Sequence, residues 1–286
     1  MNRRDLIRIA PLLRASRYEV LPTARAEDSV LESVPTDVTI TVTASPAKGL
    51  GATFDLTERL ARHGYHVVPH LSARLVRDGA HRSEILARLT ILGIDDVFVP
   101  AGDAESPTGD YDAALGVLER LTAMGGPFAQ VGITGYPQSH PTIGDDVAIQ
   151  SMWDKRRHAT YIVSNLCFDA AALRRWISRI RARGVSLPLL IGLAGPVERA
   201  KLLAMATKIG VGDATRFLSG HSSALFRLGA PGAYQPQRLL EKVGPTLTAP
   251  DSMVAGLHIF TFNQLAGAQA WRADLLSQLP APSLQE

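Results

Sequence analysis

The chain alternates short, apolar, β-branched runs with longer segments of helical periodicity, and this alternation constrains its fold more than any other feature. Such an alternation is typical of βαβ units and a parallel sheet. Eight runs occur, which is the strand number of a closed barrel, so we expect a (β/α)8 TIM barrel rather than an open doubly wound sheet. The expected strands are 18–21, 38–43, 66–71, 96–100, 130–136, 161–166, 188–193 and 257–262.

The segments between these runs carry apolar residues three and four apart, as do helices that cover one face of a sheet. A long stretch between the seventh and eighth strands, 210–255, holds two further helical patterns. Because long connections in compact domains tend to be functional, we expect this insertion to cap part of the barrel mouth. The expected helices are 54–63, 81–92, 111–124, 170–183, 197–209 and 263–278, a weaker one at 28–34, and 214–228 and 235–247 in the insertion.

The 286 residues suit one barrel domain with an N-terminal extension (1–17), the insertion and a loose tail (279–286). With 46% hydrophobic and 20% charged residues, the composition excludes a disordered chain. The single cysteine, Cys167, excludes a disulfide framework, and the basic start lacks an apolar leader, so we expect a cytoplasmic protein. The net charge of +3 is too small for a nucleic-acid footprint, and no segment predicts a membrane span.

Active sites of such barrels form at the carboxyl ends of the strands, so polar residues there are the first candidates. Glu19 is a carboxylate within an apolar strand; burial would raise its pKa and make it a general acid, whereas an exposed Glu19 would pair with Arg17 or Arg25. The other polar residues at or near these ends are Thr41, Thr43, His70, Ser72, Asp103, Tyr136, His140, Asn165, Thr261 and Asn263.

Asp103 follows Gly102, which permits a tight turn directly after the fourth strand. A carboxylate fixed there could accept paired hydrogen bonds from an amidine-like heterocycle or stabilise a cationic intermediate; the alternative is a turn-capping Asp. Glu19 and Asp103 together would give two carboxylates whose environments could separate their pKa values.

Three other patterns carry less functional weight. His66 and His70 are four residues apart on a strand and have no carboxylate at ligand spacing, so we expect no metal site. The Gly49-Leu50-Gly51 stretch lacks the third small residue of a dinucleotide fingerprint. Cys167 follows the sixth strand beside an aromatic residue, and we expect it to be packed rather than reactive.

In combination, these residues resemble the methylenetetrahydrofolate reductase family of barrel enzymes over nearly the whole chain. The family's first strand carries a proton-donating Glu followed by Pro, as at Glu19 and Pro22. The ending Pro69-His70-Leu71 matches its third strand. Later matches are Gly102-Asp103, Tyr136-Pro137 with His140-Pro141, Ser164-Asn165 with Phe168-Asp169, and His258 with Thr261 and Asn263.

Departures from the family pattern fall mainly where it binds flavin. Ala101 replaces an arginine associated with FAD, and Val42-Thr43-Ala44 replaces Tyr-Gly-Ala. Asp154 introduces an acidic group beside Lys155, where the family has a lysine-rich stretch. Each lost cation removes charge-assisted hydrogen bonds worth about 1.5–3 kcal/mol. Asn165 also shortens the family's pterin-binding Gln.

The resemblance implies an oxidoreductase of one-carbon metabolism and methionine biosynthesis that reduces 5,10-methylenetetrahydrofolate to 5-methyltetrahydrofolate. The departures favour direct hydride transfer from NADH, or alternatively NADPH, without bound FAD. An FAD-bound reductase and a non-catalytic folate-binding barrel are the alternatives. We expect a folate substrate, with or without a polyglutamyl tail, and a monomer or small homo-oligomer. The implied roles are Glu19 and Asp103 in catalysis, Asn165, Tyr136, Phe260 and Phe262 in substrate binding, and Thr41, His70, His140 and Lys155 in cofactor binding.

Overall fold

Eight parallel strands form the centre of the computed structural model, which describes residues 1–140, 142–198, 202 and 233–279. Their order is β3-β2-β1-β10-β7-β6-β5-β4. A bridge between His70 and Phe98, with Leu71 N donating to Phe98 O at 2.8 Å, joins the two ends of this order. The predicted (β/α)8 barrel is thereby confirmed. The strands are β1 (Arg17–Val20), β2 (Thr39–Val42), β3 (Val67–Pro69), β4 (Asp96–Phe98), β5 (Gln130–Gly135), β6 (Tyr161–Ser164), β7 (Leu189–Ala194) and β10 (Val254–Phe260).

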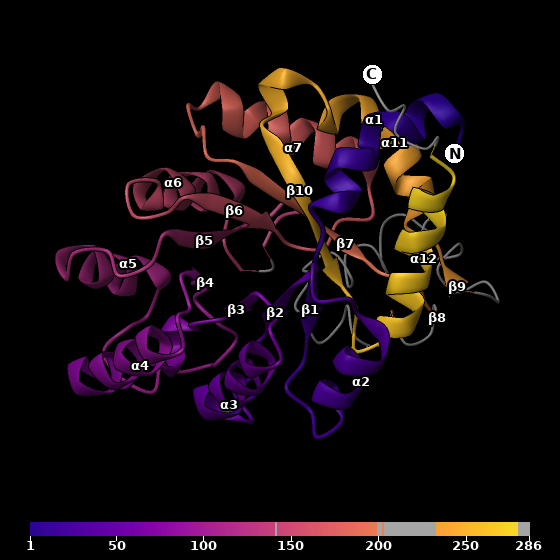
Figure 1. Cartoon of the computed structure of the whole chain (residues 1–286). Helices are drawn as coiled ribbons and strands as arrows, with labels where there is room; N and C mark the ends of the chain where they lie inside the picture. Colours follow the sequence, from indigo (N-terminus) through magenta and orange to yellow (C-terminus); the bar gives the residue numbers. More distant parts are fainter. Residues whose placement is uncertain (141, 199–201, 203–232, 280–286) are drawn as a thin grey trace, which may run out of the picture.

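Helices surround the strands, as Figure 1 shows, and each covers the sheet with an apolar stripe. In α7 (Ala170–Ala182), Asp169 caps the first turn by accepting from Ala171 N at 2.7 Å, and Leu173, Trp176 and Ile180 are buried below it. The other helices after strands are α2 (Ala26–Ser33), α3 (Gly49–Arg62), η1 (Ala73–Leu75), α4 (Gly79–Ile91), α5 (Ala114–Ala123), α6 (Asp145–Lys155) and α12 (Leu265–Ser277).

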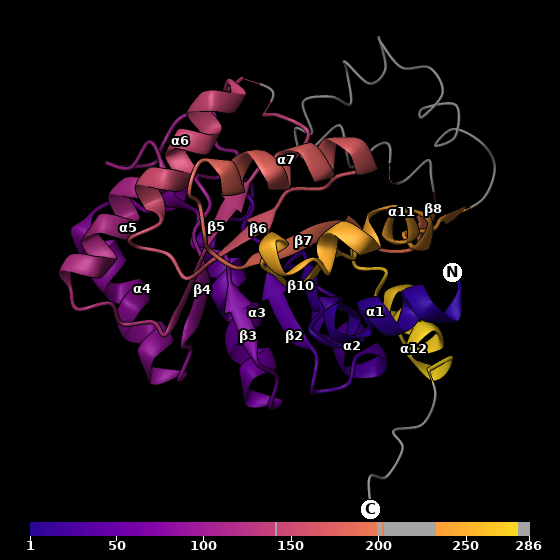
Figure 2. The ribbon, with the colours of Figure 1, turned by 90° about the horizontal axis from the view of Figure 1, so that it is seen from above.

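Two helices were absent from the sequence prediction. The N-terminal extension is mostly the helix α1 (Arg3–Arg14), which buries Leu6, Ile9 and Leu13. It packs against α11 (Gln237–Leu247) and α12, and the three helices lie together in both views of the molecule (Figures 1 and 2). Arg272 of α12 binds the end of α1 through its Nε, which donates to Leu13 O at 2.8 Å. The second unpredicted helix, α6, has a narrow buried stripe, which explains its weak signal.

The insertion between β7 and β10 is partly described. A short antiparallel pair, β8 (Val197–Glu198) and β9 (Ala233–Tyr234), lies at its two edges. The helix expected over 197–209 is therefore wrong at its start, because Val197 pairs with Tyr234. The helix α11 (Gln237–Leu247) confirms the second helical pattern, and η2 (Pro250–Ser252) follows it. The expected helix 214–228, most of 197–209 and the tail after 279 lie outside the described residues.

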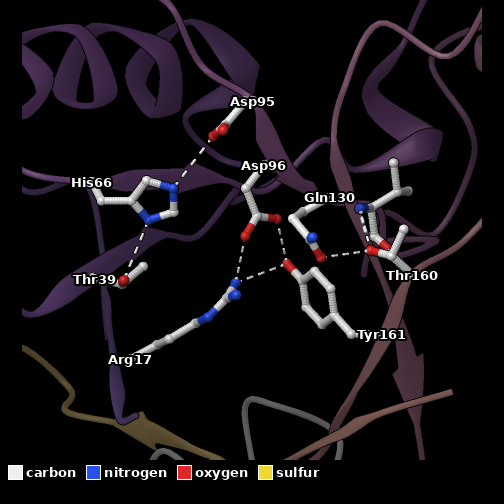
Figure 3. Close-up of polar contacts among 9 residues, drawn as sticks. Arg17, Thr39, His66, Asp95, Asp96, Gln130, Thr160 and Tyr161 are labelled. Atoms are coloured by element: carbon white, nitrogen blue, oxygen red, sulfur yellow. Dashed lines mark hydrogen bonds and ion pairs between the residues drawn. The ribbon is translucent and has the colours of Figure 1, made fainter. Parts of the chain in front are cut away.

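The barrel interior has an apolar layer, with polar residues near its two ends. Val68, Phe98, Val163 and Leu190 pack with the ring of Tyr161. At the amino end, the side chains of Arg17, Asp96 and Tyr161 meet across the barrel, as Figure 3 shows.

These three side chains form the floor cluster. Arg17 Nη1 donates to Asp96 Oδ2 at 2.8 Å and to Tyr161 Oη at 3.0 Å, and Tyr161 Oη donates to Asp96 Oδ1 at 2.8 Å. Gly132 makes room for the Tyr161 ring, since a Cβ at this glycine would lie 2.4 Å from the ring. The floor cluster therefore fills the amino end of the barrel with satisfied polar groups.

The described helices include none that combines the length and the hydropathy needed to cross a membrane.

Candidate functional site

Four polar side chains from four strands gather toward the carboxyl end of the barrel: Glu19 of β1, Thr41 of β2, His70 at the end of β3 and His258 of β10. Glu19 Oε2 lies 3.1 Å from His258 Nε2 and 3.8 Å from His70 Nε2. Parallel register places Thr41 of β2 directly beside Glu19, whereas His258 is in register with Arg17 and its side chain reaches Glu19 diagonally across the two neighbouring strands. We call these four residues the mouth cluster.

The Glu19 side chain is largely buried, with 16% of its surface exposed. Burial alone would raise its pKa, but the hydrogen bond from His258 and the nearby His70 outweigh burial, and the pKa of Glu19 is lowered. This direction is opposite to the raised pKa that burial in an apolar strand predicts. The reason for the difference is His258, a partner that the local sequence around Glu19 does not reveal.

His70 is buried, and burial lowers its pKa to about 4, against a smaller raising effect of Glu19. The imidazole is therefore neutral near pH 7. Its ring contacts the Phe98 ring edge-on, with centroids 4.7 Å apart. This contact with the apolar layer fixes the ring below the mouth.

Three buried polar atoms of the mouth cluster have no hydrogen-bond partner in the described part of the chain: Thr41 Oγ1, His70 Nε2 and His258 Nδ1. Buried polar atoms are nearly always paired in folded proteins. Three such atoms around one carboxylate indicate that this level of the barrel is built to meet a polar ligand or bound water.

Asp103 follows β4 on an exposed turn at the mouth. Gly102 has a φ of 96°, and a Cβ there would lie 1.8 Å from Ser72 Oγ, so the turn requires glycine. Reduced solvation raises the pKa of Asp103; His140 opposes this effect and the charge of Glu19 adds to it. The charge of Glu19 therefore influences Asp103, and the pKa values of the two carboxylates move in opposite directions.

The loop after β5 brings Tyr136 and His140 together, with ring centroids 4.8 Å apart and planes perpendicular. His140 Nδ1 accepts from the backbone N–H groups of Thr142 and Ile143, each at 3.2 Å. These bonds leave Nε2 as the nitrogen that carries the proton in the neutral ring. Burial lowers the pKa of His140, and Asp103 opposes that shift.

Asn165 stands just after β6 and is partly buried. Its Oδ1 accepts from Leu166 N at 2.8 Å, which leaves the amide NH2 group for a ligand. Sequence reasoning missed the buried Gln138, whose Oε1 accepts from Phe168 N at 2.7 Å and ties the loop after β5 to the loop after β6. Its position between the two candidates Tyr136 and His140 was the available signal.

Phe260 and Phe262 are buried in a small apolar cluster above the mouth cluster. Their neighbours there include Leu166 after β6 and Val197 and Leu202 of the insertion. The Phe260 ring also contacts His258 edge-on, with centroids 4.8 Å apart. The two aromatic rings therefore connect the mouth cluster with the insertion.

Several predicted residues lie apart from the mouth cluster or serve the backbone. Lys155 is buried at the end of α6, where the chain turns back toward the amino end of β6, and burial lowers its pKa to about 8. Thr261 Oγ1 donates to Glu19 O at 2.6 Å. Asn263 Oδ1 accepts from Leu21 N at 2.8 Å, so both residues join the ends of β10 and β1.

Comparison with known proteins identifies relatives at the level of sequence. The sequence model described as methylenetetrahydrofolate reductase matches residues 24–213, a region that contains β2 to β7 and begins after β1. Methylenetetrahydrofolate reductase 2 of Saccharomyces cerevisiae is 26% identical over 101 residues, which cover 33% of this chain and 17% of the yeast protein. The match thus spans less than a fifth of that relative's length.

Solved structures with a similar course of the chain are more distant. The C-terminal domain of a putative chitinase from Desulfitobacterium hafniense has a TM-score of 0.47 at 12% identity, covering 92% of this chain and 99% of that one. Dihydropteroate synthase from Thermus thermophilus has a TM-score of 0.46 at 12% identity, covering 92% of each chain. At these values the likenesses carry no argument about activity.

Proposed function

This chain belongs to the methylenetetrahydrofolate reductase family, and we propose that it reduces 5,10-methylenetetrahydrofolate to 5-methyltetrahydrofolate with NADH as direct hydride donor. The observation that carries this proposal is the Glu19 carboxyl, which lies inside the carboxyl half of the barrel in contact with His258. Reduction of the methylene bridge requires an acid at this kind of position, because the bridge must open before it accepts a hydride.

The two carboxylates, Glu19 and Asp103, have different roles in the ring opening. Glu19 donates a proton to N10 of the folate as the bond between N10 and the methylene carbon breaks, and the electron pair of that bond stays on N10. The lone pair of N5 then forms a double bond to the carbon, which leaves a cation at N5. Asp103 stabilises this cation and holds the pterin edge, while the amide NH2 of Asn165 orients the ring.

The residues present fit a nicotinamide as the reductant. Thr41 Oγ1 and His70 Nε2 are buried and unpaired among the described residues, and a carboxamide offers both a donor and an acceptor to such atoms. When bound, the reduced nicotinamide supplies the hydride that the folate cation accepts. His140, with Nε2 free to donate, is proposed to contribute to the same dinucleotide.

The flavin-free part of the proposal is supported by substitutions in the sequence. Ala101 and Asp154 stand where the family has cationic side chains around the flavin. Lys155, which remains, is buried at the end of α6 rather than beside the mouth cluster. A flavin diphosphate would therefore find fewer charge-assisted hydrogen bonds at these positions.

A single pair of measurements tests the proposal. The purified protein should show no flavin absorbance in the visible range and should oxidise NADH only when methylenetetrahydrofolate is present, with NADPH as the comparison donor. A yellow protein whose turnover disappears when the flavin is removed would contradict the direct transfer. Folate binding without any turnover would instead indicate a non-catalytic barrel.

The proposed reaction also sets the cellular context. Its product supplies methyl groups, so we propose a role in one-carbon metabolism and methionine biosynthesis, in the cytoplasm. The small surplus of positive charge is proposed to help bind a polyglutamylated folate. We propose a monomer or small homo-oligomer built from one barrel domain.

A further inference from the structure

His258 is buried to 1% exposure inside the barrel, and its Nε2 faces the carboxyl of Glu19 at 3.1 Å. The two residues are 239 positions apart in sequence and meet because β1 and β10 are neighbouring strands. A buried histidine whose ring is aimed at a carboxylate has either a structural role or an effect on the proton that the carboxylate handles.

The two ring nitrogens of His258 differ in their surroundings. Nε2 points at a carboxylate oxygen and donates to it. Nδ1 is buried and has no partner among the described residues. The contact between His258 and Glu19 is therefore made by Nε2.

This donor distinguishes the two oxygens of the carboxyl group. Oε2 accepts from His258, and in the described part of the chain no hydrogen bond ends on Oε1. We propose that His258 is a positioning residue for the proton donor: it holds Oε2 of Glu19 and leaves Oε1 as the oxygen that carries the proton to the folate. The inference rests on the proposed reductase function.

In the proton transfer itself, the Oε1–H bond breaks and an N10–H bond forms. The bond from N10 to the methylene carbon breaks at the same time, and His258 neither gains nor loses a proton. A donor to Oε2 stabilises the carboxylate that the transfer leaves behind, so it makes Glu19 a stronger acid toward the weakly basic N10.

The other groups that face Glu19 give matched controls. His70 of β3 lies 3.8 Å from the same oxygen, beyond hydrogen-bond distance, and is neutral near pH 7. Asp103, after β4, faces Glu19 as a negative charge, and Thr41 of β2 is uncharged. Among these groups only His258 donates directly to the carboxyl in the described part of the chain.

The test compares His258→Leu, His258→Gln and His70→Gln in the full-length protein. The readout is the pH titration of the Glu19 carboxyl carbon by NMR in protein labelled at the glutamate carboxyls, assigned by the loss of its signal in Glu19→Gln. In His258→Leu the titration midpoint should move up by about one pH unit or more, because burial is no longer opposed by the hydrogen bond. His258→Gln, whose amide can still donate, should restore most of the wild-type value, and His70→Gln should move it less than His258→Leu.

The pH profile of kcat supplies the second readout. In wild type, kcat should continue to rise as the pH falls; in His258→Leu this rise should level off at a higher pH and at a lower maximal kcat. A merely structural role would lower kcat without moving the profile, and an NMR midpoint that does not move in His258→Leu would overturn the proposal. If the wild-type protein shows no reductase activity, the proposed function fails, while the NMR titration still decides the role of His258.

Discussion

At the scale of single residues, Glu19 combines two opposing environments. Burial disfavours its charged form, and the His258 hydrogen bond, together with the nearby His70, favours it with the larger effect. A carboxyl group with a lowered pKa is mostly ionised at neutral pH and is a strong acid when protonated. Its use as a proton donor therefore has consequences for both turnover and pH dependence.

Replacing Glu19 with Gln keeps the size of the side chain and removes its proton. We expect kcat to fall by about 10²–10⁴-fold with little change in KM for the folate, because the proton is transferred in the transition state. Steady-state kinetics measure both parameters. Glu27→Gln is the control, since Glu27 forms a surface ion pair with Arg59 and should leave both parameters unchanged. Full turnover in Glu19→Gln would contradict the assignment.

The lowered pKa of Glu19 also predicts the direction of the pH dependence. Above the pKa, the protonated fraction of the acid falls about tenfold per pH unit, so turnover should increase as the pH is lowered from about 8 to about 6. Single-turnover rates across this range measure the effect free of product release. A rate that is constant or falls toward acid pH would argue against Glu19 as the donor.

Sequence alone identified some site residues and not others, for a physical reason. Glu19 and His70 could be predicted because each is a polar side chain in an apolar strand. The hydrogen bond between Glu19 and His258 could not, since it depends on the register of two strands at opposite ends of the chain. Asn263 shows the converse case: its side chain, read as a site candidate, bonds the backbone of Leu21.

At the scale of elements, the turn after β4 positions Asp103 through one glycine. Gly102→Ala adds a Cβ that collides with Ser72 and forces a positive φ on alanine, so we expect the Asp103 turn to move and kcat/KM for the folate to fall at least about tenfold. Gly64→Ala is the matched control, because its φ is also positive, at 84°, but no atom lies within 4 Å of the added Cβ.

Both variants should lose about 1 kcal/mol of folding stability, because alanine disfavours a positive φ, and thermal unfolding measures this loss. Only Gly102→Ala should also lose catalytic efficiency. Equal kinetics in the two variants would show that the turn does not position Asp103 for the reaction.

The strands of the barrel could be predicted from the sequence because neighbouring elements bury both of their faces. All eight strands were predicted because β-branched runs such as Ile162-Val163 are typical of parallel strands that are covered on both sides. The helix α1 was missed because Pro11 and its basic residues obscured the apolar spacing of Leu6, Ile9 and Leu13. The apolar stripe of α1 is buried by α11 and α12, which lie far from α1 in the sequence.

At the scale of the whole molecule, the two ends of the barrel have different tasks. The floor cluster at the amino end is paired within itself (Figure 3), whereas the mouth cluster at the other end has unpaired buried atoms in the described part of the chain. The apolar layer of Val68, Phe98, Val163 and Leu190 lies between them. This arrangement predicts that changes at the floor alter stability and leave the chemistry intact.

Arg17→Met tests this separation, because it removes the cation that faces Asp96, a carboxylate with 1% of its side chain exposed. We expect the free energy of unfolding at neutral pH to fall by about 3–5 kcal/mol, the usual cost of leaving one buried charge unpaired. Arg179→Met, which breaks exposed ion pairs from α7 to Asp145 and Asp146 of α6, should cost much less than Arg17→Met, because water screens exposed charges. Denaturant unfolding measures both values, and kcat of the folded Arg17→Met protein should equal that of wild type.

The pH dependence of this loss has a defined sign. Burial already raises the pKa of Asp96 against the opposing effects of Arg17 and Tyr161, and removing Arg17 raises it further. The unfolded carboxyl has its ordinary, lower pKa, so the loss of stability in Arg17→Met is absent at pH values below that pKa. The loss grows as the pH rises through the pKa of Asp96 in the folded protein.

Adding Asp96→Asn should recover most of the loss at neutral pH, because the amide is uncharged and can still bond Tyr161. A loss that is independent of pH, or that Asp96→Asn does not relieve, would show that packing of the Arg17 side chain, rather than its charge, stabilises the floor.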